Sequence, residues 1–237
     1  MGVSTTARAG ELADNLAFVR GRIAAACAAA GRDPAKITLI AVTKTFPASD
    51  VRLLAGLGIA EVGENRDQEA APKAAECADL PLTWHFVGQL QTNKARAVAA
   101  YADVVQSVDR ARLVSALSAG AVRAERTLRC LVQVSLDERP GGRGGAAPAE
   151  VPGLAGLIAG ADGLELGGVM AVAPQGADPA RAFERLARIA ADLRAAHPEA
   201  TAISAGMSGD LEQAVACGAT HLRIGTALLG GRSAIVR

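Results

Sequence analysis

The segment ITLIAVTKTFPASDVRLLAGLG, residues 37–58, contains one complete strand-then-helix unit. Its apolar, β-branched start, 37–43, predicts a buried strand. Pro47 then opens a helix that Gly58 ends, as proline and glycine commonly do at these positions. Outward from this unit, the same alternation recurs along the whole chain. Repeated strand-then-helix units indicate a parallel sheet covered by helices.

Counting strand-like and helix-like runs gives the architecture. Strands are predicted at 37–43, 61–63, 82–87, 104–108, 128–135, 164–172, 202–205 and 222–225. Helices are predicted at 11–30, 47–58, 66–77, 93–101, 110–124, 149–160, 179–196 and 210–217. Plausible first-turn or capping residues stand at several of these helix starts, namely Thr92, Asp109, Pro148, Asp178 with Pro179, and Ser208. Eight strands favour a closed barrel over the alternative, an open doubly wound sheet.

We therefore expect an α/β fold, a single (β/α)8 TIM-type barrel with an extra N-terminal helix, formed by one domain over 1–237. The chain continues for only about a dozen residues after the eighth strand, too few for a full helix. The N-terminal helix can cover that gap, because the first and last strands of a closed barrel are neighbours. Residues 1–10 are expected to be disordered. The glycine-rich stretch within 138–147 is expected to form a mobile loop.

Composition narrows the class of protein. Half of the residues are hydrophobic but only 3% are aromatic, so the core must consist of aliphatic side chains and alanine. With 25 basic and 24 acidic residues the net charge is +1, which makes nucleic acids and anionic membranes poor candidate partners. No apolar run reaches the roughly 18 residues of a membrane helix, and Met1–Gly10 lacks a signal-peptide core. We expect a cytoplasmic protein, and the scattered cysteines and histidines predict no metal site.

Lys44 is the residue most indicative of chemistry. It follows the first predicted strand, at the end of the barrel where such folds place their active sites. The chain has only four lysines among its 25 basic residues, and arginine cannot form an imine. Desolvation at such a position disfavours the charged form and makes the amine a nucleophile. The alternative is a structural lysine paired with a carboxylate such as Glu64, and position alone does not decide between them.

The loops after the seventh and eighth strands form a candidate phosphate site. They contain Gly206-Met207-Ser208-Gly209 and Gly225-Thr226, and barrel enzymes commonly bind phosphate there. Hydroxyls of Ser204, Ser208 and Thr226 can add donors, although ordinary turn and cap chemistry is the alternative. Because strands one and eight are adjacent, these loops and Lys44 would line one pocket. A ligand with both an aldehyde and a phosphate fits that pocket, and Arg223 could reach its ring nitrogen.

At this point the residues resemble those of a known family. The segments that carry the resemblance are Ala41-Val42-Thr43-Lys44, Gly63-Glu64-Asn65, Trp84-His85-Phe86-Val87-Gly88-Gln89-Leu90-Gln91-Thr92-Asn93-Lys94, Gly168-Val169-Met170, Ser204-Ala205-Gly206-Met207-Ser208 and Arg223-Ile224-Gly225-Thr226. In this order they look like the pyridoxal phosphate homeostasis protein family, whose barrel resembles the N-terminal domain of alanine racemase (fold type III of the enzymes that use pyridoxal 5′-phosphate, PLP). Two departures are Arg66, where tyrosine is frequent, and Ala205, where a larger residue is common.

The resemblance implies a set of cofactor-binding residues. PLP is expected as a covalent imine on Lys44, with Asn65 near the ring, Arg223 at the pyridine nitrogen and Met207 in the pocket. The resemblance further assigns the phosphate to Ser204, Gly225 and Thr226. It gives no residue a catalytic role. For His85, Gln91, Asn93 and Lys94 it supplies a signature without a role that the sequence explains.

Three functions remain open at this stage. The first is a PLP carrier for intracellular homeostasis without substantial turnover, a monomer that contacts PLP-dependent apoenzymes transiently. The second is a weakly active amino-acid racemase, which would need a second acid/base that the chain does not offer. Its one tyrosine, Tyr101, is expected in an outer helix far from the barrel mouth. The third is a barrel enzyme that acts on a sugar phosphate through a lysine imine.

Overall fold

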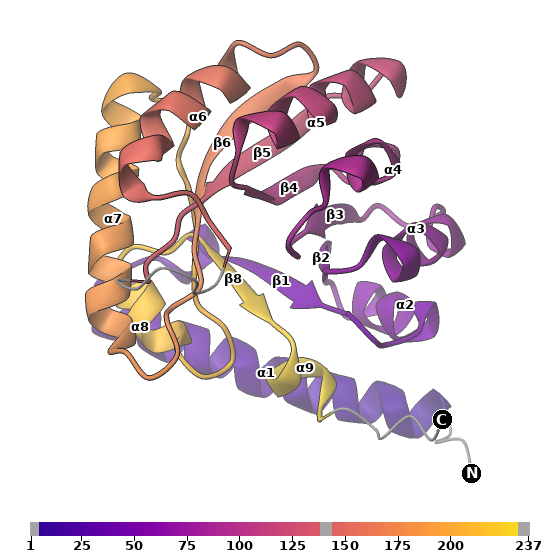
Figure 1. The fold of residues 1–237 in the computed structure, drawn as a ribbon. Helices are drawn as coiled ribbons and strands as arrows, with labels where there is room; N and C mark the ends of the chain where they lie inside the picture. Colours follow the sequence, from indigo (N-terminus) through magenta and orange to yellow (C-terminus); the bar gives the residue numbers. More distant parts are fainter. Residues whose placement is uncertain (1–4, 138–143, 232–237) are drawn as a thin grey trace.

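The computed structural model describes residues 5–137 and 144–231. Eight parallel strands close into a barrel in chain order, with β1 paired to β8, and helices lie around its outside (Figure 1). The strands are β1 (Thr38–Val42), β2 (Glu61–Glu64), β3 (Thr83–Phe86), β4 (Val104–Val108), β5 (Leu128–Gln133), β6 (Leu164–Met170), β7 (Ala202–Ser204) and β8 (His221–Ile224). The predicted barrel is therefore confirmed, and an open sheet is excluded.

The helices follow the strands nearly as predicted. They are α1 (Thr5–Ala29), α2 (Ala48–Gly56), α3 (Asp67–Glu76), α4 (Ala95–Ala99), α5 (Ala111–Arg123), α6 (Val151–Ala159), α7 (Pro179–Ala196), α8 (Leu211–Ala216) and α9 (Thr226–Leu229), with short 3-10 turns η1 (Pro34–Lys36), η2 (Thr92–Lys94) and η3 (Pro148–Glu150). Asp178 caps α7 by accepting from the backbone N–H of Ala180. Ser208 does not cap α8, whose N-cap is Asp210.

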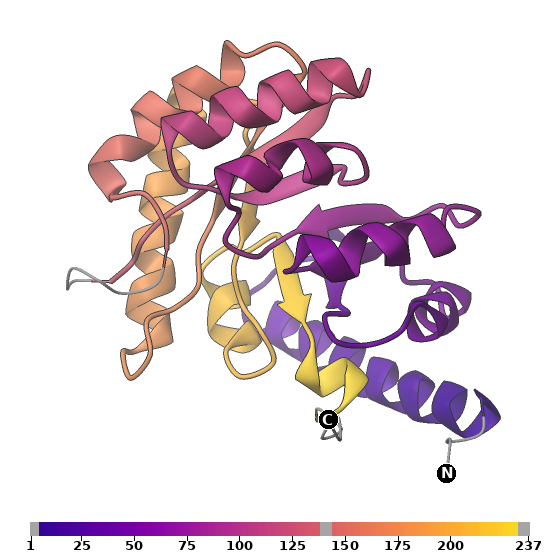
Figure 2. The same cartoon turned by 45° about the vertical axis from the view of Figure 1, so that its right-hand side comes forward.

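Helix α1 closes the side of the barrel that lacks a full eighth helix. It runs beside β8 and packs against α8 and the short α9, as both ribbon views show (Figures 1 and 2). The predicted apolar stripe of α1 is buried, with Leu12, Leu16, Val19 and Ile23 at most 6% exposed. Burial of such a stripe is the main source of stability for a helix on a barrel surface.

Two predictions about flexible segments need correction or lie partly outside the described residues. Helix α1 already begins at Thr5, so residues 5–10, expected to be disordered, are helical. The expected mobile loop at 138–147 falls mostly in 138–143, which lie outside the described residues. Its last part is held against the end of β5. Ala146 is buried there, donates its N–H to the carbonyl of Gln133 and accepts from the N–H of Ser135.

The barrel encloses its own small apolar cluster, separate from the layer between strands and helices. Val104, Leu131, Met170 and Ala202, from four successive strands, form it. Glycine at position 168 allows β6 to approach β7 here, because a Cβ would stand 2.0 Å from the carbonyl oxygen of Ala202. Gly168 also has a φ of +143°, which side chains disfavour. Polar side chains, described below, also lie inside the barrel.

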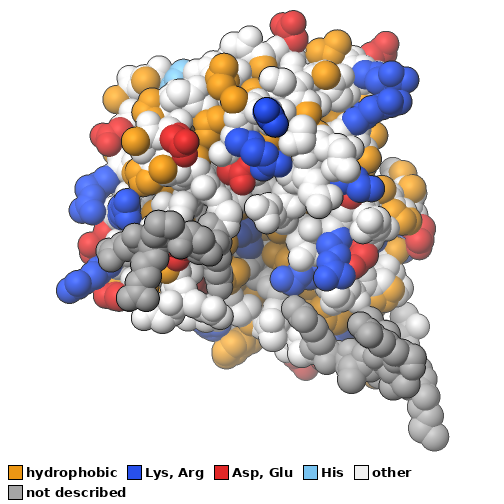
Figure 3. All heavy atoms as spheres, in the orientation of Figure 1, with side chains coloured by type: hydrophobic (Ala, Val, Ile, Leu, Met, Phe, Trp, Pro, Cys, Tyr) orange, Lys and Arg blue, Asp and Glu red, His pale blue; other side chains and the backbone are white. Residues whose placement is uncertain are grey.

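Charge is mixed over the surface. Lys, Arg, Asp and Glu side chains alternate on the face shown in Figure 3, and the basic ones do not gather into one patch there. Among the described residues, no helix is long and apolar enough to cross a membrane. Within the same residues, no group of three or more His, Cys, Asp or Glu side chains is arranged to hold a metal ion.

Candidate functional site

Lys44 lies in the short turn between β1 and α2 and lines a cavity at the carboxyl end of the barrel. The turn has an unusual backbone: Thr45 has a φ of +68°, although it is neither glycine nor asparagine. The carboxylate of Glu69 holds this conformation by accepting from the Thr45 N–H at 3.1 Å. A β-branched residue in this region is strained, and such strain is concentrated at functional sites.

The carboxylate considered as a partner for Lys44 is paired with a different lysine. Glu64, fully buried at the end of β2, accepts at Oε1 from Lys73 Nζ at 2.5 Å and from Thr43 Oγ1 at 2.6 Å. Lys73 also donates to the carbonyl of Thr43 at 2.9 Å. Burial raises the pKa of Glu64, and the hydrogen bond from Lys73 opposes that rise. The alternative of a Lys44–Glu64 pair is therefore wrong.

Lys73 is a functional-site neighbour that the sequence reasoning missed. Its signal was its place on α3 between two buried alanines, Ala70 and Ala74, which predicts an inward side chain. Lys44 itself is half-buried and has no hydrogen bond or ion pair with any residue that the structure describes. Of the two lysines near the barrel mouth, one is engaged and one is free.

The cavity brings six of the seven predicted cofactor-binding residues together. Its volume is about 480 Å³, which suits a small aromatic ligand with a phosphate. The predicted residues in its wall are Lys44, Asn65, Met207, Arg223, Gly225 and Thr226. Ser208 and the apolar side chains of Val42, Phe46 and Val172 complete much of the remaining wall. An apolar wall with a few convergent polar groups is typical of a cofactor pocket.

Ser204 is the predicted residue that the structure places elsewhere. It is the last residue of β7, it is fully buried inside the barrel, and it does not line the cavity. Its hydroxyl donates to Gln106 Oε1 at 2.7 Å and accepts from Arg223 at 2.6 Å. The side chain therefore reaches the cavity through Arg223, and the phosphate contact of Ser204 stays a prediction.

The two candidate phosphate loops are joined directly. Ser208 Oγ accepts from the backbone N–H of Ala227 at 3.1 Å, which links the loop after β7 to the first turn of α9. The N–H of Arg223 donates to the carbonyl of Gly206 at 3.0 Å on the same side. The first-turn N–H groups of α9 have no acceptor within their own helix. Residues 206–209 and 225–227 therefore form one wall rather than two separate turns.

Arg223 supplies a buried positive charge to the cavity. Its side chain, 4% exposed, donates from NH1 to Ser204 Oγ and from NH2 to the carbonyl of Ala171 at 2.8 Å. Burial lowers the pKa of this guanidinium to about 10, so it stays protonated near neutral pH. No carboxylate among the described residues forms an ion pair with it, and its other N–H groups remain for an acceptor in the cavity.

Asn65 presents an unused polar atom beside the cavity. Its Oδ1 is buried without a hydrogen-bond partner among the described residues. Gly88, which follows β3, fits against its backbone so closely that a Cβ would stand 2.2 Å from the Asn65 carbonyl oxygen. The cavity therefore offers an unsatisfied buried oxygen, a free amine and a buried guanidinium to a ligand with complementary polar groups.

The second sequence signature has divided roles in the structure. His85 lies inside the barrel. Lys94 is the N-cap of α4, and its Nζ lies 3.9 Å from Oδ2 of Asp67. Gln91 and Asn93 belong to the η2 turn and its N-cap, and neither lines the cavity. Tyr101, expected in an outer helix, lies in the turn after α4 and does not line the cavity, and burial raises the pKa of its phenol.

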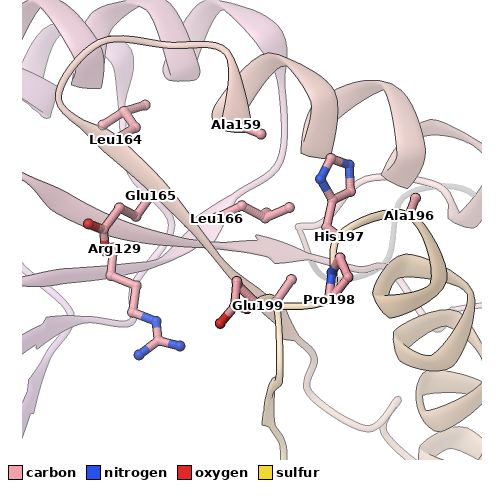
Figure 4. Close-up of a pocket in the computed structure, with 10 residues that line it drawn as sticks. Arg129, Ala159, Leu164, Glu165, Leu166, Ala196, His197, Pro198 and Glu199 are labelled. Atoms are coloured by element: carbon pink, nitrogen blue, oxygen red, sulfur yellow. The ribbon is translucent and has the colours of Figure 1, made fainter.

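A second hollow lies at the opposite end of the barrel. It is bordered by the starts of β5 and β6 and by the turn after α7, with Arg129, Glu165 and His197 on its walls (Figure 4). Amino-terminal ends of barrel strands rarely carry catalytic or cofactor sites. The cavity around Lys44 is therefore the candidate site.

Fold and site together define a closed parallel β/α barrel with a candidate cofactor cavity at the carboxyl ends of its strands. The family model described as alanine racemase, N-terminal domain, matches residues 11–233. The pyridoxal phosphate homeostasis protein of Mycobacterium tuberculosis (strain H37Rv) is 45% identical, with 95% of this chain and 94% of that protein covered. This chain belongs to the alanine racemase N-terminal domain family and, within it, to the pyridoxal phosphate homeostasis proteins.

Solved structures agree with that assignment. An unknown protein from Bifidobacterium adolescentis superposes with a TM-score of 0.87 at 32% identity, covering 94% of this chain and 96% of that one. PipY of Synechococcus elongatus PCC7942, solved with PLP bound, superposes with a TM-score of 0.78 at 35% identity, covering 92% of this chain and all of that one.

Proposed function

We propose that this chain holds PLP reversibly as an imine on Lys44 and serves PLP homeostasis without substantial turnover. One observation carries the proposal: the free amine of Lys44 shares its cavity with Arg223 and with the loop at Gly225 and Thr226. The names of its relatives and the PLP-bound neighbour support the choice of cofactor.

Different residues bind different parts of the cofactor. The Lys44 amine adds to the aldehyde carbon and gives up two hydrogens, which leave with the aldehyde oxygen as water. Backbone N–H groups at Gly225 and Thr226 receive the phosphate, as helix N-termini do for anions. Arg223 donates to the pyridine nitrogen, while Asn65 lies beside the ring.

Slow chemistry follows from the same arrangement. PLP supplies an electron sink when bound, and an arginine donor that leaves the ring nitrogen unprotonated weakens that sink. Among the described residues that line the cavity, Lys44 and Arg223 are the titratable ones. A racemase needs a second acid/base on the other side of the substrate, and Arg223 stays protonated near neutral pH. Racemase activity would therefore be weak, with Lys44 acting alone.

Borohydride trapping tests the proposal. Borohydride converts an imine into a stable amine, so intact mass and peptide mapping after incubation with PLP should locate one adduct on Lys44. Lys44→Ala should abolish that adduct. Lys36→Ala, which changes a lysine in the η1 turn, should retain it. Adducts that persist in Lys44→Ala, or rapid interconversion of L- and D-alanine by the wild type, would refute the proposal.

The proposal extends to the protein's setting. It includes a monomer that works in the cytoplasm and passes PLP to apoenzymes by transient contact. A closed barrel has no unpaired sheet edge that requires a partner strand, which supports the monomer. Light scattering at micromolar concentration should report the mass of one chain, and a stable dimer would contradict this part.

A further inference from the structure

Polar side chains from five strands form one hydrogen-bonded chain through the barrel interior. Arg223 on β8 contacts Ser204 on β7 at 2.6 Å, and Ser204 contacts Gln106 on β4 at 2.7 Å. Gln106 continues to His85 Nδ1 on β3 at 2.8 Å, and His85 Nε2 reaches Glu61 on β2 at 2.6 Å. Gln106 and Ser204 are fully buried and His85 is 3% exposed, whereas Glu61 is partly open to solvent.

Donor and acceptor chemistry gives this chain a single direction. A guanidinium can only donate, so Ser204 accepts from Arg223 and its own proton goes to the amide oxygen of Gln106. The amide nitrogen of Gln106 can only donate, so His85 Nδ1 accepts and carries no proton. The proton of His85 is then on Nε2 and points to the carboxylate of Glu61. Every hydrogen in the chain points from Arg223 toward Glu61.

Such a chain addresses the cost of burying Arg223. A buried charge without a counter-ion is expensive unless hydrogen bonds compensate it. Here the compensation runs through three neutral groups to a carboxylate, and aligned hydrogen bonds polarise one another. The carbonyl of Ala171 holds the other terminal nitrogen of Arg223 at 2.8 Å. The guanidinium is thus fixed in position with donors left over on its cavity side.

We propose that Ser204, Gln106 and His85 are positioning residues that hold Arg223 as the donor to the pyridine nitrogen of PLP. Glu61 is the acceptor at the far end of the chain. This inference rests on the proposed function, since it concerns the contact that Arg223 makes with the cofactor. It also gives roles to the hydroxyl of Ser204, which does not line the cavity, and to His85.

The cofactor-bound test measures the ring nitrogen itself. With ¹⁵N-labelled PLP, the pyridine ¹⁵N shift of the wild type should be that of an unprotonated, hydrogen-bonded nitrogen. Ser204→Ala and His85→Leu should move this shift and weaken PLP binding by about tenfold, the scale of one hydrogen bond to a charged group. His85→Gln should restore both values, because its amide can accept at one end and donate at the other.

A matched control separates this role from general damage to the barrel. Ser107 is also a buried serine on a strand, but its hydroxyl has no partner among the described residues. Ser107→Ala removes the same atom as Ser204→Ala and should leave the ¹⁵N shift and PLP affinity unchanged. Equal effects of both serine variants would overturn the inference.

A second measurement needs no cofactor. Imidazole ¹⁵N spectra of the ligand-free protein, with His85 assigned by its loss in His85→Gln, should place the ring proton on Nε2. Gln106→Glu offers Nδ1 an acceptor and should move a proton to it. A proton on Nδ1 in the wild type contradicts the chain direction. If wild-type protein forms no Lys44 adduct, the proposed function and this inference both fail. If it does, and Ser204→Ala leaves the pyridine shift unchanged, only this inference fails.

Discussion

Removing the amine of Lys73 should leave the buried carboxylate of Glu64 without its cationic partner. Lys73→Met keeps an aliphatic chain of similar length but removes the donor to Glu64 and to the Thr43 carbonyl. Lys73 is 6% exposed and Glu64 is 0% exposed. Breaking one side of such a buried pair costs about 3–5 kcal/mol, far more than the pair contributes over a well-packed apolar replacement.

The loss should depend on pH in a defined direction. Burial already raises the pKa of Glu64 above its ordinary value of 4.5, and loss of Lys73 removes the bond that opposes the rise. A carboxyl whose folded-state pKa is raised favours folding below its unfolded pKa, and that contribution is lost as pH rises through the folded pKa. Lys73→Met should therefore be most destabilised at pH 8 and closer to wild type near pH 5, where Glu64 can take up a proton.

Urea unfolding at both pH values measures this effect. The double variant Glu64→Gln with Lys73→Met should recover much of the loss, because it leaves no buried charge. Arg52→Met, which breaks an exposed ion pair with Asp79, is the matched control and should show no such pH dependence. A Lys73→Met variant as stable as wild type at pH 8, or equally destabilised at both pH values, would refute the reasoning.

Three further outcomes are expected. Gly88→Ala places a Cβ against the Asn65 carbonyl and should cost about 1–3 kcal/mol in urea unfolding and weaken PLP binding; unchanged binding would contradict the close fit. Burial lowers the pKa of His221 to about 4, so stability present at pH 7 should fall by about 3 kcal/mol as pH drops from 6.5 to 4, and a His221→Gln variant should lack that slope. Arg8→Met removes the cationic partner of mostly buried Asp50 and should lower the midpoint of thermal unfolding. An unchanged midpoint would contradict a structural role for this pair.

The barrel was predictable because its evidence is local. Each strand is a short apolar run bounded by turn residues, and each helix has its own periodicity. The start of α1 was not predictable in this way. Arg8 is held there by Asp50 and by the carbonyl of Leu229, which stand 42 and 221 positions away in the chain. Tertiary contacts of that separation leave no pattern in the first ten residues.

The candidate site also has a part that local sequence predicts and a part that only the tertiary structure shows. Lys44, Arg223 and Gly225 were found because each occupies the end of a strand, and strand ends of a barrel meet at one face. The hydrogen bonds of Ser204 to Gln106 and Arg223 could not be predicted, because they depend on which way the last residue of β7 faces. The hydrogen-bonded chain through Gln106 joins five strands, and only the closed barrel brings them together.

The proposed role of Lys44 depends on its contrast with Lys73, since the two lysines have opposite surroundings in one fold. Hydrogen bonds to Glu64 and to the Thr43 carbonyl fix Lys73 in a structural role. Because that carboxylate is occupied, Lys44, the very next residue after Thr43, has no acidic partner among the described residues. A nucleophilic amine must not be held as an ion pair, since the cation does not attack an aldehyde. The buried pair thus both anchors the end of β1 and leaves the neighbouring amine available.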